Sequence, residues 1–175
     1  LETLIISEGI TYIGRETFRD CSGLKKITMP SSIKSIGTYA FSGCSNVDTL
    51  YWNSNVSPEC LTNYCNAKIK HVSFGDSITL IEDRALYRCS QIDNIIIPEG
   101  VKAIGEYAFY NCTGLSDVII CQGVTTIKRS AFYGCTGLTE IEIPYGVTTI
   151  GEYAFHGCSG LKTVSIPSSV TAIED

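Results

Sequence analysis

The chain has 175 residues and a formal net charge of −5, from 13 basic and 18 acidic side chains. With 44% hydrophobic and only 18% charged residues it can bury a sizeable core, which excludes a disordered chain. The negative charge provides no cationic field for phosphate backbones or anionic lipids, and no apolar run approaches the roughly 20 residues that span a bilayer. We therefore expect neither nucleic-acid binding nor direct membrane insertion. The first ten residues also lack the basic flank of a signal peptide.

A repeat with a period of about 23 residues runs along the whole sequence. It is clearest in a set of equally spaced cysteines: Cys21 and Cys44, and then Cys89, Cys112, Cys135 and Cys158. Dividing 175 residues by this period gives about 7.6 units. A unit of this size cannot bury its own apolar face, so neighbouring units must stack and share one core. Because the sequence begins and stops inside a unit, we expect residues 1–175 to form a single solenoid that is part of a longer array.

The residue pattern of each unit predicts the same secondary-structure elements in the same order, and residues 136–158 serve as the example. Apolar and polar residues alternate over 138–143, which indicates a short strand that directs Glu140 and Glu142 outward. Pro144 ends this strand, because proline cannot donate a hydrogen bond to a ladder. The apolar pair Val147 and Ile150 allows a second, very short strand.

The last part of each unit has helical spacing. Ile150, Ala154, Phe155 and Cys158 are separated as i, i+4, i+5 and i+8. This spacing predicts one or two turns of α-helix or 3₁₀-helix before the next unit begins. Strand and helical turn together predict an α/β solenoid.

Residues 45–66 depart from the pattern. This unit lacks the strand-end proline and the Ala-Phe step, and its Val47 lies one residue closer to the equivalent Ile69 than the period requires, so one residue is deleted. Either Glu59 occupies an inward position, which a buried carboxylate resists, or the loop shifts so that Cys60 takes that place, which we favour. The deletion indicates a local irregularity rather than an added binding loop.

The repeated motif L-x-x-I-x-I-P-x-x-V-x-x-I-G-x-x-A-F-x-x-C, at Leu24–Cys44 and again at Leu138–Cys158, carries a family resemblance. It resembles the BspA-type leucine-rich repeats of microbial surface proteins, over essentially the whole chain. The resemblance implies a right-handed solenoid with a parallel β-sheet on its concave side, displayed on the cell surface or secreted. It further implies adhesion or recognition, with host extracellular matrix or another cell surface as partner, and no catalytic residues.

The six periodic cysteines occupy one motif position, which suggests buried free thiols that pack as small apolar groups. Cys60 and Cys65 form the one plausible disulfide, and no second ligand pair in their loop supports zinc. Cys121 replaces a strand-end proline, and we expect it to be partly exposed.

Two aromatic columns also follow the period. The first should be buried between neighbouring rungs and comprises Phe18, Phe41, Phe109, Phe132 and Phe155. The second follows the Phe position and should form a partly exposed row of rings: Tyr87, Tyr110, Tyr133 and His156.

The sequence offers no catalytic, cofactor or metal site. His71 and His156 lie several units apart on different motif positions, too far for a shared site. Asp117, Glu140 and Glu142 project from one face, but an open sheet face has no enclosed pocket to raise a carboxyl pKa. A solvated acidic surface is the better interpretation, and we expect no enzymatic activity.

The outward positions of the strands provide the candidate binding surface. One outward column reads Ile5, Thr28, Tyr51, Ser73, Ile96, Ile119, Glu142 and Ser165, which is more varied than a spacer requires. We therefore favour a protein or glycan recognition module, with an architectural spacer as the alternative. Docking should centre on Ile96 and Ile119, with the acidic residues selecting a basic or cation-bridged partner. The predicted residues are Tyr51, His71, Asn94, Ile96, Asp117, Ile119, Glu140 and Glu142.

Overall fold

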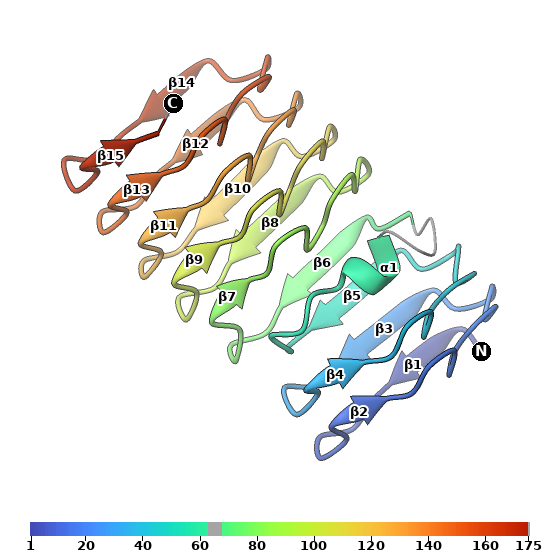
Figure 1. Cartoon of the computed structure of the whole chain (residues 1–175). Coiled ribbons are helices and arrows are strands. Elements are labelled where there is room, and N and C mark those ends of the chain that lie inside the picture. Colours follow the sequence, from blue (N-terminus) through green and yellow to red (C-terminus); the bar gives the residue numbers. More distant parts are fainter. Residues whose placement is uncertain (63–67, 175) are drawn as a thin grey trace.

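The computed structural model describes residues 1–62 and 68–174, except for the side chains of Cys60 and Thr62. The chain winds as a stack of similar rungs, with its two ends at opposite ends of the stack (Figure 1). Each regular rung contains a longer strand, a bend, a two-residue strand and a compact turn segment. The predicted parallel β-solenoid is therefore confirmed.

The longer strands form one side of the stack, which we call the long-strand row. Its members in the described part of the chain are β1 (Thr3–Ile5), β3 (Lys26–Met29), β5 (Thr49–Trp52), β6 (His71–Phe74), β8 (Asn94–Ile97), β10 (Asp117–Ile120), β12 (Glu140–Glu142) and β14 (Thr163–Ser165). Their side chains alternate between the core and the outside, as in β8 and β10, where exposed and buried residues follow each other.

The two-residue strands form the opposite side, the short-strand row (Figure 1). Its described members are β2 (Tyr12–Ile13), β4 (Ser35–Ile36), β7 (Leu80–Ile81), β9 (Ala103–Ile104), β11 (Thr126–Ile127), β13 (Thr149–Ile150) and β15 (Ala172–Ile173). The second, very short strand that the sequence allowed is thus present, and β7, β9, β11, β13 and β15 form one continuous parallel sheet.

The pairing register preserves the repeat. Thr3 pairs with Lys26 and Lys26 with Thr49, so each step equals one full period of the sequence. The next step, from Thr49 to His71, is one residue shorter. The deletion therefore falls in the irregular unit, as the sequence indicated, and the ladder absorbs it without a change of face.

The core is a stack of equivalent side chains from neighbouring rungs. Phe109 and Phe132 lie face to face with ring centroids 5.1 Å apart, and Phe132 stacks on Phe155 at 5.5 Å. Phe41 is also fully buried, whereas Phe18 and Phe155, towards the two ends of the stack, are half-buried. The prediction of a buried Phe column is confirmed for the interior rungs, and the outer members, Phe18 and Phe155, bury less because they lie in the first and last turn segments of the stack and are covered by a neighbouring turn segment on one side only.

The predicted helical turns of the regular units are wrong. Tyr107 and Asn111 have φ angles of 56° and 54°, in the left-handed region that a right-handed helix excludes. Alternate amides point along the stack: Phe109 N donates to Ala131 O at 2.8 Å, and Asn111 N to Tyr133 O at 2.7 Å. The segment is therefore a series of turns whose amides bond to the next rung, and the α/β designation is not supported.

The irregular unit contains α1 (Glu59–Thr62), the one helix in the described part of the chain. Ser57 caps it through its hydroxyl, which accepts a hydrogen bond from Glu59 N at 3.2 Å, and Pro58 precedes its first residue. Leu61 of this helix is fully buried, while Glu59 is only half-buried. A leucine on a helical turn thus fills the core here; the predicted role of Cys60, and its pairing with Cys65, lie outside the described side chains.

The periodic cysteines pack against the backbone of the preceding rung. Five of the six are buried and Cys21 is half-buried. The Sγ atoms of Cys112 and Cys135 donate to the carbonyl oxygens of Leu86 and Phe109 at 3.0 and 3.1 Å. Burial raises the pKa of the Cys89 thiol to about 12. The free, buried thiols agree with the small apolar groups that the motif predicted, and four of them, Cys44, Cys112, Cys135 and Cys158, also donate to a backbone carbonyl.

Replacement of Phe132 by alanine tests the shared core. The fully buried ring has a stacked neighbour on each side, so Phe132→Ala leaves a hole that cannot collapse and should cost about 3–5 kcal/mol in unfolding free energy. Urea denaturation monitored by circular dichroism measures this loss. Phe155→Ala, at a half-buried ring, is the matched control and should cost less. A loss below about 1 kcal/mol for Phe132→Ala contradicts the stacked core.

Alkylation of the native protein tests the thiols. With a pKa of about 12, only about one Cys89 side chain in ten thousand is a thiolate at pH 8, and burial blocks access as well. Mass spectrometry without reductant should therefore find the six periodic cysteines unbonded, and the five buried ones slow to react with iodoacetamide until denaturant is added. Half-buried Cys121 should react faster and serves as the internal control. Detection of a bond such as Cys112–Cys135 in the native protein refutes this account.

Candidate binding face

The eight predicted binding residues lie on the outward surface of the long-strand row, which we call the outer face. They occupy two columns: His71, Asn94, Asp117 and Glu140 in the first, and Tyr51, Ile96, Ile119 and Glu142 in the second. All eight side chains are exposed. The register places Ile119 directly beside Ile96, and Asp117 beside Asn94. Strand alternation and stacking thus bring together residues that are far apart in the sequence.

Ile96 and Ile119 form an apolar patch at the centre of the outer face. Their exposed fractions are 57% and 49%, and Tyr51, further along the same column, is 40% exposed. Isoleucine favours β-structure, which by itself explains a strand isoleucine but not two exposed neighbours in register. Such side chains are available for burial against a partner.

The hydrogen-bonded sheet of the long-strand row is interrupted twice. The described ladders join β1, β3, β5 and β6, then β8 and β10, then β12 and β14. β6 still lies beside β8, and β10 beside β12 (Figure 1). The interruptions therefore loosen neighbouring strands without separating the stack.

A proline follows the later strand at every weakened pairing of the long-strand row. Where that position holds Gly75 or Cys121, its amide donates to the preceding rung, at 3.0 Å to Trp52 O and 3.1 Å to Ile97 O, and four residues pair. Pro98 and Pro144 have no amide hydrogen and occupy this position at the two interruptions. The other two strand-end prolines, Pro30 and Pro167, accompany pairings shortened to three residues.

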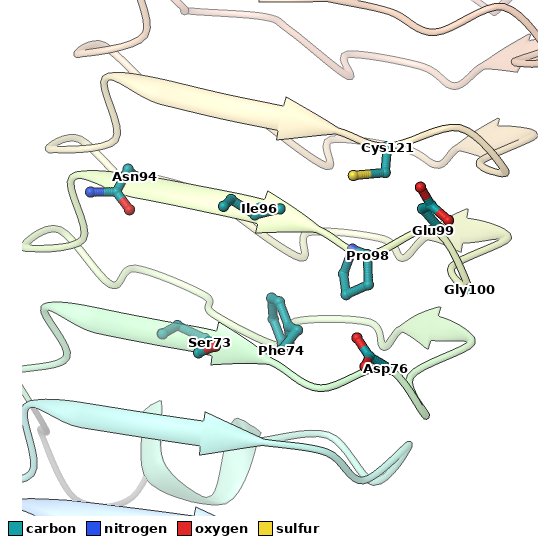
Figure 2. A pocket seen from close by; sticks show the side chains of 10 residues that line it. Ser73, Phe74, Asp76, Asn94, Ile96, Pro98, Glu99, Gly100 and Cys121 are labelled. Carbon is teal, nitrogen blue, oxygen red and sulfur yellow. The ribbon is translucent and has the colours of Figure 1, made fainter.

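The first interruption opens a groove of about 690 Å³ between β6 and β8, which we call the β6–β8 groove. Figure 2 shows Ser73 and Phe74 on the β6 side, Asn94, Ile96 and Pro98 on the β8 side, and Asp76 and Glu99 beyond the strand ends. Two of the predicted binding residues, Asn94 and Ile96, line it. A second groove, of about 340 Å³, lies at the other interruption and is lined by Ile119, Glu142 and Pro144 among others.

Sequence reasoning missed the β6–β8 groove and most of its lining. Phe74, Asp76, Pro98 and Glu99 were not among the predicted residues, although Cys121, at the edge of the groove, is partly exposed as expected. The available signal was the change from Gly75 to Pro98 at the same motif position, which marks where the ladder loses a donor.

Charge is distributed unevenly around the rungs. Residues 71–79, 91–101, 114–124 and 137–147, which contain β6, β8, β10 and β12, have no lysine or arginine, whereas Lys68 and Lys70 directly precede β6. The same four segments contain six carboxylates: Asp76, Asp93, Glu99, Asp117, Glu140 and Glu142. The intervening segments 80–90, 102–113 and 125–136 contain five basic and three acidic residues. The outer face from β8 to β12 therefore carries only acidic charge, and it favours a cationic partner.

The predicted row of rings on the turn segments is present. Tyr87 stacks on Tyr110 with centroids 5.1 Å apart, Tyr110 on Tyr133 at 4.8 Å, and Tyr133 on His156 at 4.9 Å. The three tyrosines are half-buried and His156 is exposed. Because the rings cover one another's faces, they mainly stabilise the contact between rungs.

The described residues hold no group of three or more histidine, cysteine, aspartate or glutamate side chains that could bind a metal ion. His71 lies on the outer face and His156 on the turn segments, so the structure does not bring the two histidines together. In the described part of the chain, no helix is long and apolar enough to cross a membrane.

A stack of parallel rungs with one exposed, chemically varied strand face is the architecture of a solenoid repeat protein. The chain belongs to the BspA type leucine rich repeat family: the family model matches residues 1–65 and 59–175, with six copies. This finding confirms the resemblance that the repeated motif indicated. No curated protein gives a significant match.

Solved leucine-rich-repeat structures are similar along almost the entire chain. A leucine rich cell surface protein from Faecalibacterium prausnitzii is 26% identical with a TM-score of 0.67, over 98% of this chain and 48% of that one. A leucine-rich repeat protein from Bacteroides ovatus is 23% identical with a TM-score of 0.64, over 99% and 48%. The T. pallidum leucine rich repeat protein is 23% identical with a TM-score of 0.66, over 98% and 72%. The chain thus spans about half the length of the first two.

Truncation of two stacked tyrosines tests the role of the ring row. Tyr110→Ser and Tyr133→Ser each remove stacking on two neighbours and should lower the unfolding free energy by about 1–3 kcal/mol. Tyr145→Ser, at a tyrosine that is 71% exposed, is the control and should change it by less than about 0.5 kcal/mol. Urea denaturation measures all three variants. If the two ring variants lose more free energy of binding to a partner than free energy of unfolding, the ring row is itself a binding surface.

Proposed function

We propose that the chain is a non-catalytic recognition module, displayed outside the cell, that binds a protein partner through its outer face. The observation that carries the proposal is the exposed, in-register pair Ile96 and Ile119 on a face that carries only acidic charge between β8 and β12. An apolar centre with a charged edge is a common composition for a protein interface. The cell-surface description of the Faecalibacterium prausnitzii protein supports surface display.

Each part of the face has a distinct role in this proposal. Ile96 and Ile119 are buried on binding and supply most of the affinity, because removing an isoleucine side chain from water contributes about 1.5–3 kcal/mol. Asp117, Glu140 and Glu142 select a basic or cation-bridged partner and accelerate its approach. A glycan of basic character fits the same charge pattern, and host extracellular matrix is the first source of partners to examine.

Direct binding measurements test the outer face. The purified chain is screened against extracellular matrix proteins and glycans, and each ligand found is titrated against Ile96→Ser/Ile119→Ser and Glu140→Gln/Glu142→Gln. The isoleucine pair should lose at least about tenfold in affinity, because two apolar contacts are removed. The carboxylate pair should lose less and become less sensitive to salt.

Matched controls separate the outer face from general surface changes. Ile10→Ser/Ile173→Ser removes two exposed isoleucines elsewhere, and Glu106→Gln/Glu174→Gln removes two carboxylates near the short-strand row. Both controls should bind as the unaltered chain does. If neither outer-face pair changes affinity while circular dichroism shows intact folding, the site is not on this face. If no ligand binds, the architectural spacer is the better description.

A further inference from the structure

We propose that the β6–β8 groove anchors a lysine or arginine side chain of a partner peptide. This inference rests on the binding function proposed above and specifies the chemistry that the outer face recognises. It follows from three properties of the groove: apolar walls, a surplus of hydrogen-bond acceptors with two carboxylates among them, and flanking strands that contain no lysine or arginine.

The walls suit the aliphatic stem of a long basic side chain. Phe74 and Val72 are partly buried on the β6 side, and Ile96 and Pro98 lie opposite them on the β8 side (Figure 2). Lysine and arginine bury their methylene stems against such surfaces while the charged head stays near polar groups. A groove of about 690 Å³ has ample room for one such side chain and part of its backbone.

The polar groups of the groove are mainly acceptors. Asp76 and Glu99, both exposed, supply carboxylates at the strand ends (Figure 2). Between β5 and β6, the Trp52 carbonyl accepts a hydrogen bond from the Gly75 amide. The equivalent residues between β6 and β8 are Phe74 and Pro98, and Pro98 has no amide hydrogen to donate to the Phe74 carbonyl. The Asn94 amide already donates to Asp93 Oδ1 at 2.8 Å.

A donor-only group is the natural complement of this arrangement. The lysine ammonium has three donors and the arginine guanidinium five, and neither accepts. Charge-assisted hydrogen bonds to carboxylates are about twice as strong as neutral ones. Because the flanking strands contain no lysine or arginine, no side chain of these strands competes for the carboxylates. Only two carboxylates line the groove, which is fewer ligands than a calcium site needs.

Peptide binding provides the direct test. The probe is a fluorescein-labelled peptide of alternating lysine and serine, with an arginine–serine peptide in parallel, measured by fluorescence anisotropy at low ionic strength. The comparison peptide carries Nε-acetyl-lysine, which keeps the stem and removes the charge. The lysine or arginine peptide should bind and the acetylated peptide should bind at least about tenfold more weakly.

Two variant pairs separate the groove from the overall negative charge. Asp76→Asn/Glu99→Gln removes the groove carboxylates, and Glu106→Gln/Glu174→Gln changes the net charge equally near the short-strand row. The groove pair should lose at least about tenfold in affinity for the basic peptide and the control pair less than twofold. An equal loss in both pairs shows non-specific attraction and overturns the proposal.

A steric variant leaves the charge unchanged. Ser73→Trp places a large ring in the groove, and Ser165→Trp places the same ring at the equivalent position of β14, away from it. Only Ser73→Trp should abolish binding of the basic peptide. The proposal is overturned if neither basic peptide binds the unaltered chain, or if Ser73→Trp binds normally. Should Ile119→Ser weaken a partner from the screen while the groove variants do not, the proposed function stands and this anchor fails.

Discussion

Shared burial between neighbouring rungs is the interaction on which this structure depends. A unit of about 23 residues presents apolar side chains that have no partner within the unit, so every rung uses its neighbours as the other half of its core. The ring of Phe132 illustrates this arrangement, because it is covered by Phe109 on one side and Phe155 on the other. The same stacking aligns equivalent outward residues in columns. The arrangement of the outer face therefore follows from the packing of the core.

Hydrogen bonds fix the spacing that the core requires. Amides of the turn segments donate to the next rung, and amides at the strand ends, such as those of Gly75 and Cys121, donate to the preceding rung, so many backbone groups are satisfied along the stack rather than within each unit. The thiol of Cys135 adds a side-chain hydrogen bond between rungs, which it donates to the carbonyl oxygen of Phe109 at 3.1 Å. Because the core and the backbone hydrogen bonds hold the rungs together, the outward side chains contribute little to stability. These positions can therefore hold isoleucine, tyrosine or glutamate.

The strand-end prolines connect this regularity to the grooves. A proline ends its own strand, and it has no amide hydrogen to donate to the carbonyl of the preceding rung. It therefore removes one hydrogen bond of the ladder at a defined place. Pro98 and Pro144 stand at the two interruptions of the long-strand row, and a groove lies at each. Acidic residues line both grooves, and Glu99 is shared between them. Both grooves of the outer face therefore lie beside a strand-end proline of the repeated motif.

The sequence by itself determined the period, the strands and the sidedness of each strand, because stacking units repeat their apolar positions and strands alternate at every residue. This was enough to place all eight predicted residues, Ile96 and Ile119 among them, on one exposed face. The tertiary structure decided the rest. The i, i+4 spacing of Ile150 and Ala154 resembled a helix, yet the turn amides find their acceptors on the next rung, which no local pattern reveals. The β6–β8 groove likewise lies where Pro98 has no amide hydrogen to donate to the Phe74 carbonyl. These two residues belong to different rungs, so they become neighbours only when the rungs stack.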